Sequence, residues 1–226
     1  MNKPRHELKF FINFSDYFEI KNRIKYIAYL DKNANTYGTY HIRSLYFDNF
    51  NDKALVEKIN GYSKREKFRI RYYNDNFDFI RLEKKSKING LCTKFSASIT
   101  KEECKKLLNN DIDWMLNSNK SLIKELYFKM KSQMLKPKTV VDYTREAYIY
   151  KPGNVRITID SNVRTGIYSQ DIFNMTLPTI KIPNNDTIIL EVKFDEFLPD
   201  IIKDVIQTNT RKSTSISKYA SSRMFG

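Results

Sequence analysis

A row of alternating positive charges is the first feature of this sequence that could do chemistry. Residues 64–74 read KREKFRIRYYN, so that Arg65, Lys67, Arg69 and Arg71 alternate with Phe68, Ile70 and Tyr72. Successive side chains of a strand point to opposite faces, and the four cations would therefore share one face. Arginine binds the oxygens of phosphate groups in pairs, and lysine neutralises them as a point charge. The row therefore predicts an anion-binding surface.

Other predicted strands repeat this division between a charged and an apolar face. In residues 78–86, Arg81, Glu83 and Lys85 alternate with Ile80 and Leu82. The same alternation places Glu7 with Lys9, Arg156 with Asp160, and Glu191 with Lys193 on one face of their respective strands. Of the twelve arginines, eight fall in predicted strands: Arg5, Arg43, Arg65, Arg69, Arg71, Arg81, Arg145 and Arg156. The codon bias of an AT-rich genome could explain many lysines, but it does not concentrate arginine in strands.

Two arrangements account for strands of this kind. In one, an antiparallel sheet has a dry face on helices and a wet face in solvent. In the other, the strands form a barrel that is apolar outside and charged inside. Like charges on adjacent strands destabilise a sheet unless something neutralises them. We therefore favour the barrel, with an extended chain of phosphates in its interior.

The composition is that of a basic globular protein. The chain has 226 residues and a net charge of +14, which is typical of partners such as nucleic acid, anionic membranes or polyanionic substrates. Its apolar runs are far shorter than the roughly 20 residues that span a bilayer, and its N-terminus lacks a signal-peptide pattern. Cys92 and Cys104 form no disulfide or zinc pattern. We expect one domain over residues 1–226, without a membrane segment, in the cytoplasm.

The periodicity of the sequence predicts an α+β fold. The eight predicted strands cover residues 5–13, 39–48, 64–74, 78–86, 91–99, 138–150, 154–162 and 187–194. Turns at Asn74–Asn76, Asn89-Gly90 and Pro152-Gly153 predict hairpins and hence an antiparallel sheet. Amphipathic helices are expected after Ser15 as N-cap, after a Thr100–Glu103 capping box, over residues 120–134, and after Pro199. The predicted fold is a closed eight-stranded antiparallel barrel, or tunnel, with a basic interior and flanking amphipathic helices.

Nine short motifs resemble a known family. They are Arg5–Lys9, Ile42–Asp48, Lys67–Tyr72, Leu82–Lys85, Thr93–Phe95, Tyr143–Arg145, Val155–Asp160, Leu190–Lys193 and Ser217–Tyr219. In this order, and over nearly the whole chain, they resemble the bacterial branch of the VTC (vacuolar transporter chaperone) polyphosphate polymerase domain. That domain belongs to the triphosphate tunnel metalloenzyme, or CYTH-like, superfamily.

The resemblance implies a function and a set of site residues. It implies Mn²⁺ or Mg²⁺ as cofactor and growth of polyphosphate from the γ-phosphate of ATP. The cations expected to act on the phosphates are Lys9, Arg69, Arg71, Lys85, Arg145 and Arg156, with Lys94, Lys218, Arg43 and Lys193 as further phosphate-binding residues. Glu191 is the expected metal ligand, assisted by Glu83 or Glu7. The plainer interpretation is that these carboxylates only pair with arginines.

The sequence departs from the wider superfamily at two positions. Arg5 stands where many members have the first of two glutamates, which argues against the thiamine-triphosphatase and adenylate-cyclase branches. Ser215 stands where eukaryotic polymerases have a second lysine, so that one phosphate contact is missing.

Several functions remain open from the sequence. A hydrolase of inorganic or nucleoside triphosphates and a non-catalytic polyphosphate binder are the alternatives to a polymerase. Nucleic-acid binding is disfavoured, because it would need basic residues outside and not on an interior face. The oligomeric state is not indicated.

Overall fold

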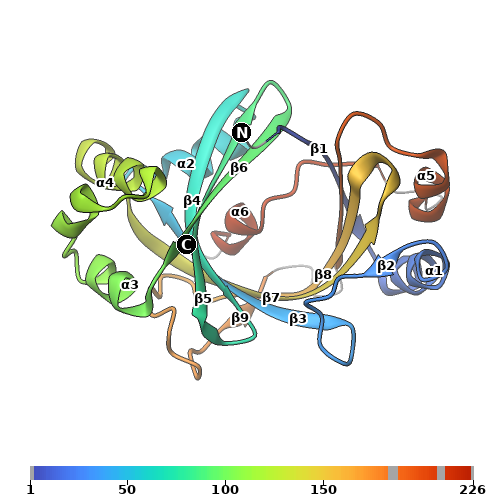
Figure 1. Ribbon diagram of the computed structural model, residues 1–226, viewed down its shortest axis with the longest axis horizontal. Coiled ribbons are helices and arrows are strands. Elements are labelled where there is room, and N and C mark those ends of the chain that lie inside the picture. Colours follow the sequence, from blue (N-terminus) through green and yellow to red (C-terminus); the bar gives the residue numbers. More distant parts are fainter. Residues whose placement is uncertain (1–2, 183–187, 208–211, 225–226) are drawn as a thin grey trace.

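The computed structural model describes residues 3–182, 188–207 and 212–224, and eight strands form the main path of its sheet (Figure 1). They are β1 (His6–Ile12), β3 (Thr39–Asp48), β4 (Lys64–Tyr73), β5 (Asn76–Ile88), β6 (Leu91–Ile99), β7 (Lys136–Tyr150), β8 (Val155–Thr165) and β10 (Ile188–Phe194). All eight predicted strands are confirmed to within a few residues, and residue 187 lies outside the described residues. Two short strands, β2 (Tyr29–Leu30) and β9 (Ile180–Lys181), were not predicted.

The described residues form six α-helices, four between strands and two after the last strand. They are α1 (Phe14–Ile24), α2 (Lys53–Ile59), α3 (Lys101–Leu108), α4 (Ser121–Gln133), α5 (Asp200–Ile206) and α6 (Lys218–Ser222), with 3₁₀ turns at Asp113–Asn117 and Pro152–Asn154. The capping box of Thr100 and Glu103 is confirmed at α3. Ser15 is not the N-cap of α1, because Asn13 and Asp16 form a capping box there and Ser15 lies inside the helix. Helices α2, of seven residues, and α6, of five residues, were not predicted.

The sheet is antiparallel but is not closed by a continuous ladder. Its strand order is β1-β10-β8-β7-β3-β4-β5-β6. Between the two edge strands, the described residues show one isolated bridge, in which Arg5 and Cys92 exchange backbone hydrogen bonds of 3.1 and 3.2 Å. The α+β architecture and the antiparallel sheet are therefore confirmed, whereas the predicted closed barrel is not.

Hairpin turns set the register of the cationic strands. Asn89 and Gly90 both have positive φ between β5 and β6, as the hairpin motif predicts. Asn74 and Asp75 adopt the same left-handed conformation between β4 and β5. This register places Lys85 opposite Lys67 on one side and Lys94 on the other. Three cations therefore lie side by side across the sheet.

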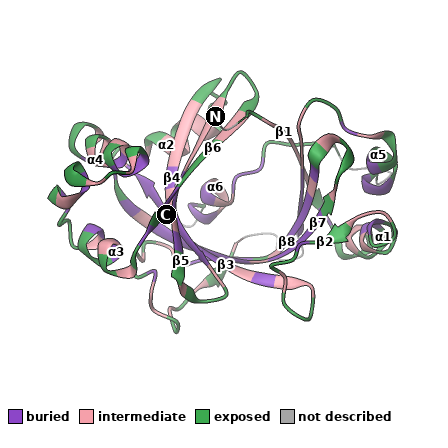
Figure 2. Cartoon of the chain, in the orientation of Figure 1, coloured by how far each residue is buried: buried purple, intermediate pink, exposed green. Residues whose placement is uncertain are grey.

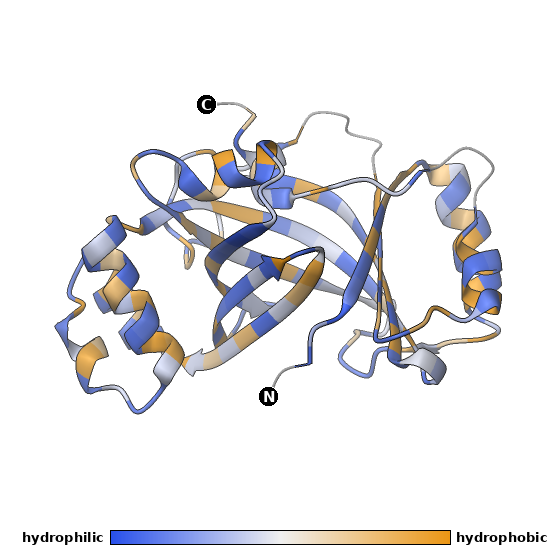
Figure 3. Ribbon diagram, turned by 90° about the horizontal axis from the view of Figure 1, so that it is seen from above, coloured by the Kyte–Doolittle hydropathy of each residue, from blue (hydrophilic) through white to orange (hydrophobic). Residues whose placement is uncertain are grey.

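Apolar side chains cover the convex face of the sheet beneath two groups of helices. Phe68, Ile70 and Leu82 pack with α3 and α4 in one cluster, and Ile157 and Leu190 pack with α1 and α5 in another. Figure 1 shows these four helices outside the curve of the strands, and Figure 2 shows that the central strands are largely buried. Along the strands, hydrophilic and hydrophobic residues alternate (Figure 3). Most of the arginines and lysines that alternate with these apolar residues therefore face the concave side.

The C-terminal segment lies on the concave side of the sheet. Thr214 donates its N–H to the carbonyl of Lys9, and Ile216 and Tyr219 join an apolar cluster with Tyr46. The Tyr219 hydroxyl donates to the buried carboxylate of Asp48 over 2.6 Å. These contacts fix α6 inside the curve of the sheet (Figure 1). Lys218, the first residue of α6, is thereby brought to the cations of the strands.

Among the described residues, no helix is both long and apolar enough to cross a membrane.

Candidate functional site

One cavity on the concave side collects most of the predicted site residues. Its volume is about 380 Å³. Twelve cationic side chains line it, against two carboxylates, those of Glu7 and Glu191. Nine of the ten predicted cations are among them: Lys9, Arg69, Arg71, Lys85, Lys94, Arg145, Arg156, Lys193 and Lys218. They come from seven strands and from α6, so the topology of the whole sheet is needed to assemble the site.

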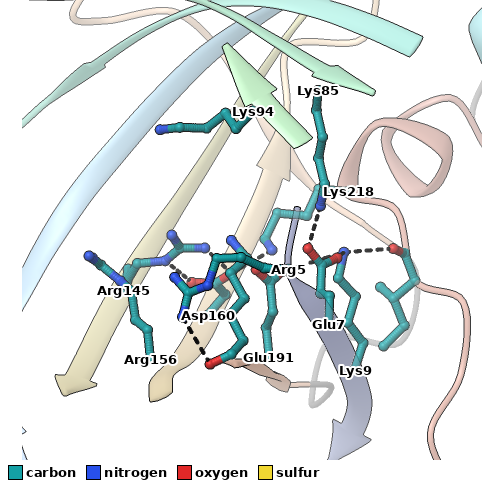
Figure 4. A network of polar contacts seen from close by, with 12 residues as sticks. Arg5, Glu7, Lys9, Lys85, Lys94, Arg145, Arg156, Asp160, Glu191 and Lys218 are labelled. Atoms are coloured by element: carbon teal, nitrogen blue, oxygen red, sulfur yellow. Dashed lines mark hydrogen bonds and ion pairs between the residues drawn. The ribbon is translucent and has the colours of Figure 1, made fainter. Parts of the chain in front are cut away.

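Lys9 stands between the two carboxylates of the lining. Its Nζ lies 2.7 Å from Glu7 Oε1 and 3.4 Å from Glu191 Oε2, and it also donates to the Ile216 carbonyl. Lys85 contacts the other oxygen of Glu7 at 2.5 Å, and Lys193 contacts Glu191 at 2.6 Å. Figure 4 shows Lys85, Glu7 and Lys9 directed toward one another. Each carboxylate is therefore shared between two lysines.

Asp160 holds two cations from beneath the lining. Its carboxylate is fully buried and accepts two hydrogen bonds from Arg145, at 2.6 and 2.7 Å. The ammonium of Lys218 lies 2.5 Å from the same carboxylate (Figure 4). Burial alone would raise the pKa of Asp160, but Arg145 and Lys218 outweigh it and lower the pKa to about 2. Asp160 was predicted on the charged face of its strand, but no role was predicted for it.

Glu83 acts in the same way on the opposite wall. Its oxygens lie 2.6 Å from Arg69, 2.8 Å from Lys94 and 3.8 Å from Arg71. Burial opposes its ionisation, yet these cations hold the pKa of the carboxyl well below its usual range. Glu83 does not line the cavity, although the sequence predicts it as a metal ligand. Its contacts favour the plainer interpretation, in which it positions cations.

Three tyrosines line the cavity, namely Tyr46, Tyr73 and Tyr143, and none of them was predicted there. The pattern around Tyr46-Phe47 predicts packing on the outer face, but only Phe47 lies there, and Tyr46 lines the cavity. Its hydroxyl accepts a hydrogen bond from Arg69 at 3.0 Å, and that of Tyr143 accepts one from Arg71 at 2.6 Å. Aromatic runs alone do not reveal which residue faces inward. Ser44, whose hydroxyl accepts a hydrogen bond from Arg71, lies two residues before Tyr46. Residues two apart in a strand share a face, and this spacing is the sequence signal that Tyr46 faces inward.

Arg43 is the predicted cation that the structure does not bring to the cavity. It shares a face of β3 with Leu45 and Phe47, which belong to the outer core. There it forms a bidentate pair with Asp142 through two hydrogen bonds of 2.8 Å and donates to the Asn174 carbonyl. The prediction of phosphate binding by Arg43 is therefore corrected. Polarity could not identify its face, because β3 carries apolar residues on both sides.

The carboxylates of the lining fit a divalent metal only in part. No group of three acidic, histidine or cysteine side chains forms a metal site within the described ranges. Glu7 and Glu191 nevertheless hold one cation, Lys9, between them, and both have pKa values below the ordinary range, that of Glu7 being about 2. Mg²⁺ is commonly held by one or two carboxylates plus substrate phosphates. Glu7 and Glu191 fit that donor set, whereas Glu83 does not.

The fold and the cavity define an α+β protein with a concave antiparallel sheet suited to an extended polyanion. The chain matches the VTC domain family over residues 4–225, and it belongs to that family. The family expected from the nine motifs is thus confirmed.

Solved structures match this chain at low sequence identity. A protein from Bacillus halodurans, described as a candidate adenylate cyclase, is 12% identical with a TM-score of 0.50, covering 85% of this chain and 81% of that one. The PH1819 protein of Pyrococcus horikoshii OT3 is 15% identical, with a TM-score of 0.42 over 89% of this chain and 84% of its own. No curated protein matches the chain at a significant level.

Proposed function

We propose that the protein is a metal-dependent polyphosphate polymerase that transfers the γ-phosphate of ATP to a growing polyphosphate chain. One observation carries the proposal: cations from seven strands and α6 converge on one cavity with two carboxylates in its lining. Membership of the VTC family supports a substrate with linked phosphates. Free cysteines at positions 92 and 104 suit a reducing cytoplasm, where ATP is available.

The arrangement of charges suits phosphoryl transfer. In this reaction a bond forms between a terminal oxygen of the chain and the γ-phosphorus, and the bond from that phosphorus to the β,γ-bridging oxygen breaks, releasing ADP. The transition state is loose, so positioning and electrostatic stabilisation supply most of the catalysis. Arg69, Arg71, Arg145 and Arg156 would hold the non-bridging oxygens, and the lysines would neutralise the remaining charge.

The carboxylates beneath the lining make this positioning possible. Asp160 fixes Arg145 through two hydrogen bonds, and Glu83 holds Arg69 through one hydrogen bond and an ion-pair contact. These guanidinium groups therefore need not reorganise during the reaction. The terminal phosphate of the chain is already ionised at neutral pH, and no general base is required. Glu191 and Glu7 would hold Mn²⁺ or Mg²⁺, which would neutralise charge on the triphosphate.

Incubation of the purified chain with ATP and Mn²⁺ tests the proposal. Reaction products are separated on a polyacrylamide gel stained for polyphosphate, and ADP and orthophosphate are measured in parallel. A polymerase yields long chains with equal amounts of ADP and incorporated phosphate. Orthophosphate without chains would identify a triphosphatase, and binding of polyphosphate without turnover would identify a binder. Either result overturns the polymerase proposal.

A further inference from the structure

Lys67 occupies a junction between two cavities. It lies on the concave face of β4, two residues before Arg69, and lines the main cavity. It also lines a smaller cavity of about 90 Å³, to which Lys58, Arg65 and Lys87 contribute further positive charge. Glu7, Lys9, Lys67, Lys85, Cys92 and Ser217 belong to the walls of both. An anion that passes from one cavity to the other must pass these residues.

Lys67 differs from the nine predicted cations in its partners. Each of those nine has a carboxylate oxygen within 4.0 Å, such as Asp31 for Arg156 at 2.7 Å. Within residues 3–182, 188–207 and 212–224, Lys67 has no such ion pair. Its Nζ lies 3.4 Å from the Ser217 hydroxyl and 5.6 Å from the ring centre of Tyr46. This confined ammonium therefore has no carboxylate partner among the described residues.

The groups that face Lys67 are mainly positive. They are Tyr46 on β3, Arg69 on β4, Lys85 on β5, Lys9 and Glu7 on β1, and Ser217 with Lys218 in the C-terminal segment. Glu7 is already shared between Lys9 and Lys85. Burial first, and then Lys85, Lys9 and Arg69, lower the pKa of Lys67 to about 7, against the opposing effect of Tyr46. Near neutral pH the site thus holds Lys67 partly uncharged.

We propose that Lys67 is a further phosphate-binding residue, which pairs with one phosphate group of the chain at the junction of the two cavities. This inference rests on the proposed function. It adds one phosphate-binding residue to the site and the uptake of one proton to the binding step. A phosphate beside Nζ supplies the missing negative charge, so its binding favours the ammonium form. Above neutral pH, binding therefore transfers one proton from solvent to the Lys67 amine.

Calorimetric titration of the full chain with inorganic tripolyphosphate tests this assignment. Lys67→Met is expected to weaken binding by roughly tenfold to a hundredfold at about pH 6, the loss typical of one charge-assisted contact. Lys67→Arg keeps a permanent charge and is expected to retain most of the affinity. At about pH 8, titration in two buffers of different protonation heat counts protons. The wild type takes up more protons than Lys67→Arg by up to one per bound tripolyphosphate.

Controls separate this inference from the proposed function. Tyr46 titrates in the same pH range, so the comparison is repeated in a Tyr46→Phe background, where the difference in proton uptake must persist. Lys131→Met removes an exposed charge from α4 and should bind as the wild type does. Circular dichroism checks that Lys67→Met is folded. If the wild type binds tripolyphosphate and Lys67→Met binds it equally well, the inference is overturned and the proposed function stands. If the wild type does not bind it, both are overturned.

Discussion

Asp160 on β8 holds Arg145 on the neighbouring strand β7 by two hydrogen bonds of 2.6 and 2.7 Å. The carboxylate has no exposed surface, while the guanidinium reaches the cavity lining. This relationship shows how the sheet tolerates crowded cations. Buried carboxylates neutralise them from behind and leave the other side of each cation for an anion.

Replacement of Asp160 by asparagine should therefore reduce both stability and activity. The variant leaves Arg145 and Lys218 buried without a negative partner, and loss of one member of a buried pair costs about 3 to 5 kcal/mol. Denaturation in urea measures the free energy of unfolding. An unchanged value in Asp160→Asn would contradict the positioning role. Glu196→Gln, which removes an exposed partner of Lys3, is the matched control and should have little effect.

The same pair predicts how acid acts on the protein. The pKa of Asp160 is lowered from 3.8 to about 2 in the folded chain, so the unfolded chain binds the proton more readily. This contribution of about 2 kcal/mol is present above pH 4 or so and is lost as the pH falls through about 2. The difference in unfolding free energy between the wild type and Asp160→Asn should therefore narrow below about pH 4. A difference in unfolding free energy that stays constant down to about pH 2 would contradict this prediction.

Arg69 and Arg43 offer a test that separates binding from folding. Both form ion pairs with carboxylates, but Arg69 lines the cavity and Arg43 lies in the outer core. Arg69→Ala should lower turnover by about 1,000-fold, as expected for loss of an arginine that stabilises the transferred phosphoryl group. Arg43→Ala should lower stability by about 3 kcal/mol while the folded fraction keeps its affinity for tripolyphosphate.

Arg43→Lys serves in place of Arg43→Ala if that variant does not fold. Steady-state kinetics and denaturation are measured on the same preparations. Retention of most turnover by Arg69→Ala, or loss of tripolyphosphate binding by folded Arg43→Lys, would contradict the assignment of faces.

Glu191 and Glu83 differ in their expected response to metal. Glu191 lines the cavity, and Glu191→Gln should raise the Mn²⁺ concentration needed for half-maximal activity about tenfold or more. Glu83→Gln should instead lower turnover without a large change in that concentration, because Glu83 contacts Arg69 and Lys94. Both effects are measured by treating each variant with a chelator, titrating it with Mn²⁺ and following its activity. Equal increases in the Mn²⁺ concentration needed by the two variants would identify Glu83 as a metal ligand.

The alternation of charge predicted the cationic face of several strands, whereas the phosphate-binding roles, and Lys94, Arg145 and Lys218 altogether, came from the family resemblance. Lys85 and Arg156 lie in strands whose odd and even positions differ sharply in polarity, so their face could be assigned from the sequence. In β3 this signal is absent, because Ile42 and Leu45 on opposite faces are both apolar and fully buried. Arg43 was therefore assigned to the wrong face.

Contacts between distant segments could not be predicted from local pattern. The place of Lys218 depends on α6, a five-residue helix fixed by the bond from Tyr219 to Asp48, 171 residues earlier. Closure of the sheet depends on how the edge strands meet, and among the described residues only the Arg5–Cys92 bridge joins them. Neither the position of α6 nor the meeting of the edge strands produces a periodic pattern in the sequence.

Tyr46 should ionise near neutral pH in the folded protein. Burial opposes formation of the phenolate, but the charges of Arg69 and Lys67, followed by Arg71 and Lys218, outweigh it and lower the pKa to about 7. Ultraviolet difference spectra should therefore show a tyrosinate signal that appears near this pH and is absent from Tyr46→Phe.

Tripolyphosphate adds negative charge beside Arg69 and should raise the pKa of Tyr46, so its addition at about pH 8 should remove the tyrosinate signal. Tyr143→Phe serves as the control, because the pKa of Tyr143 is raised to about 12 and its loss removes no signal near neutral pH. A tyrosinate signal that persists in Tyr46→Phe would assign the phenolate to another tyrosine. A signal that tripolyphosphate leaves unchanged would place the anion away from Arg69.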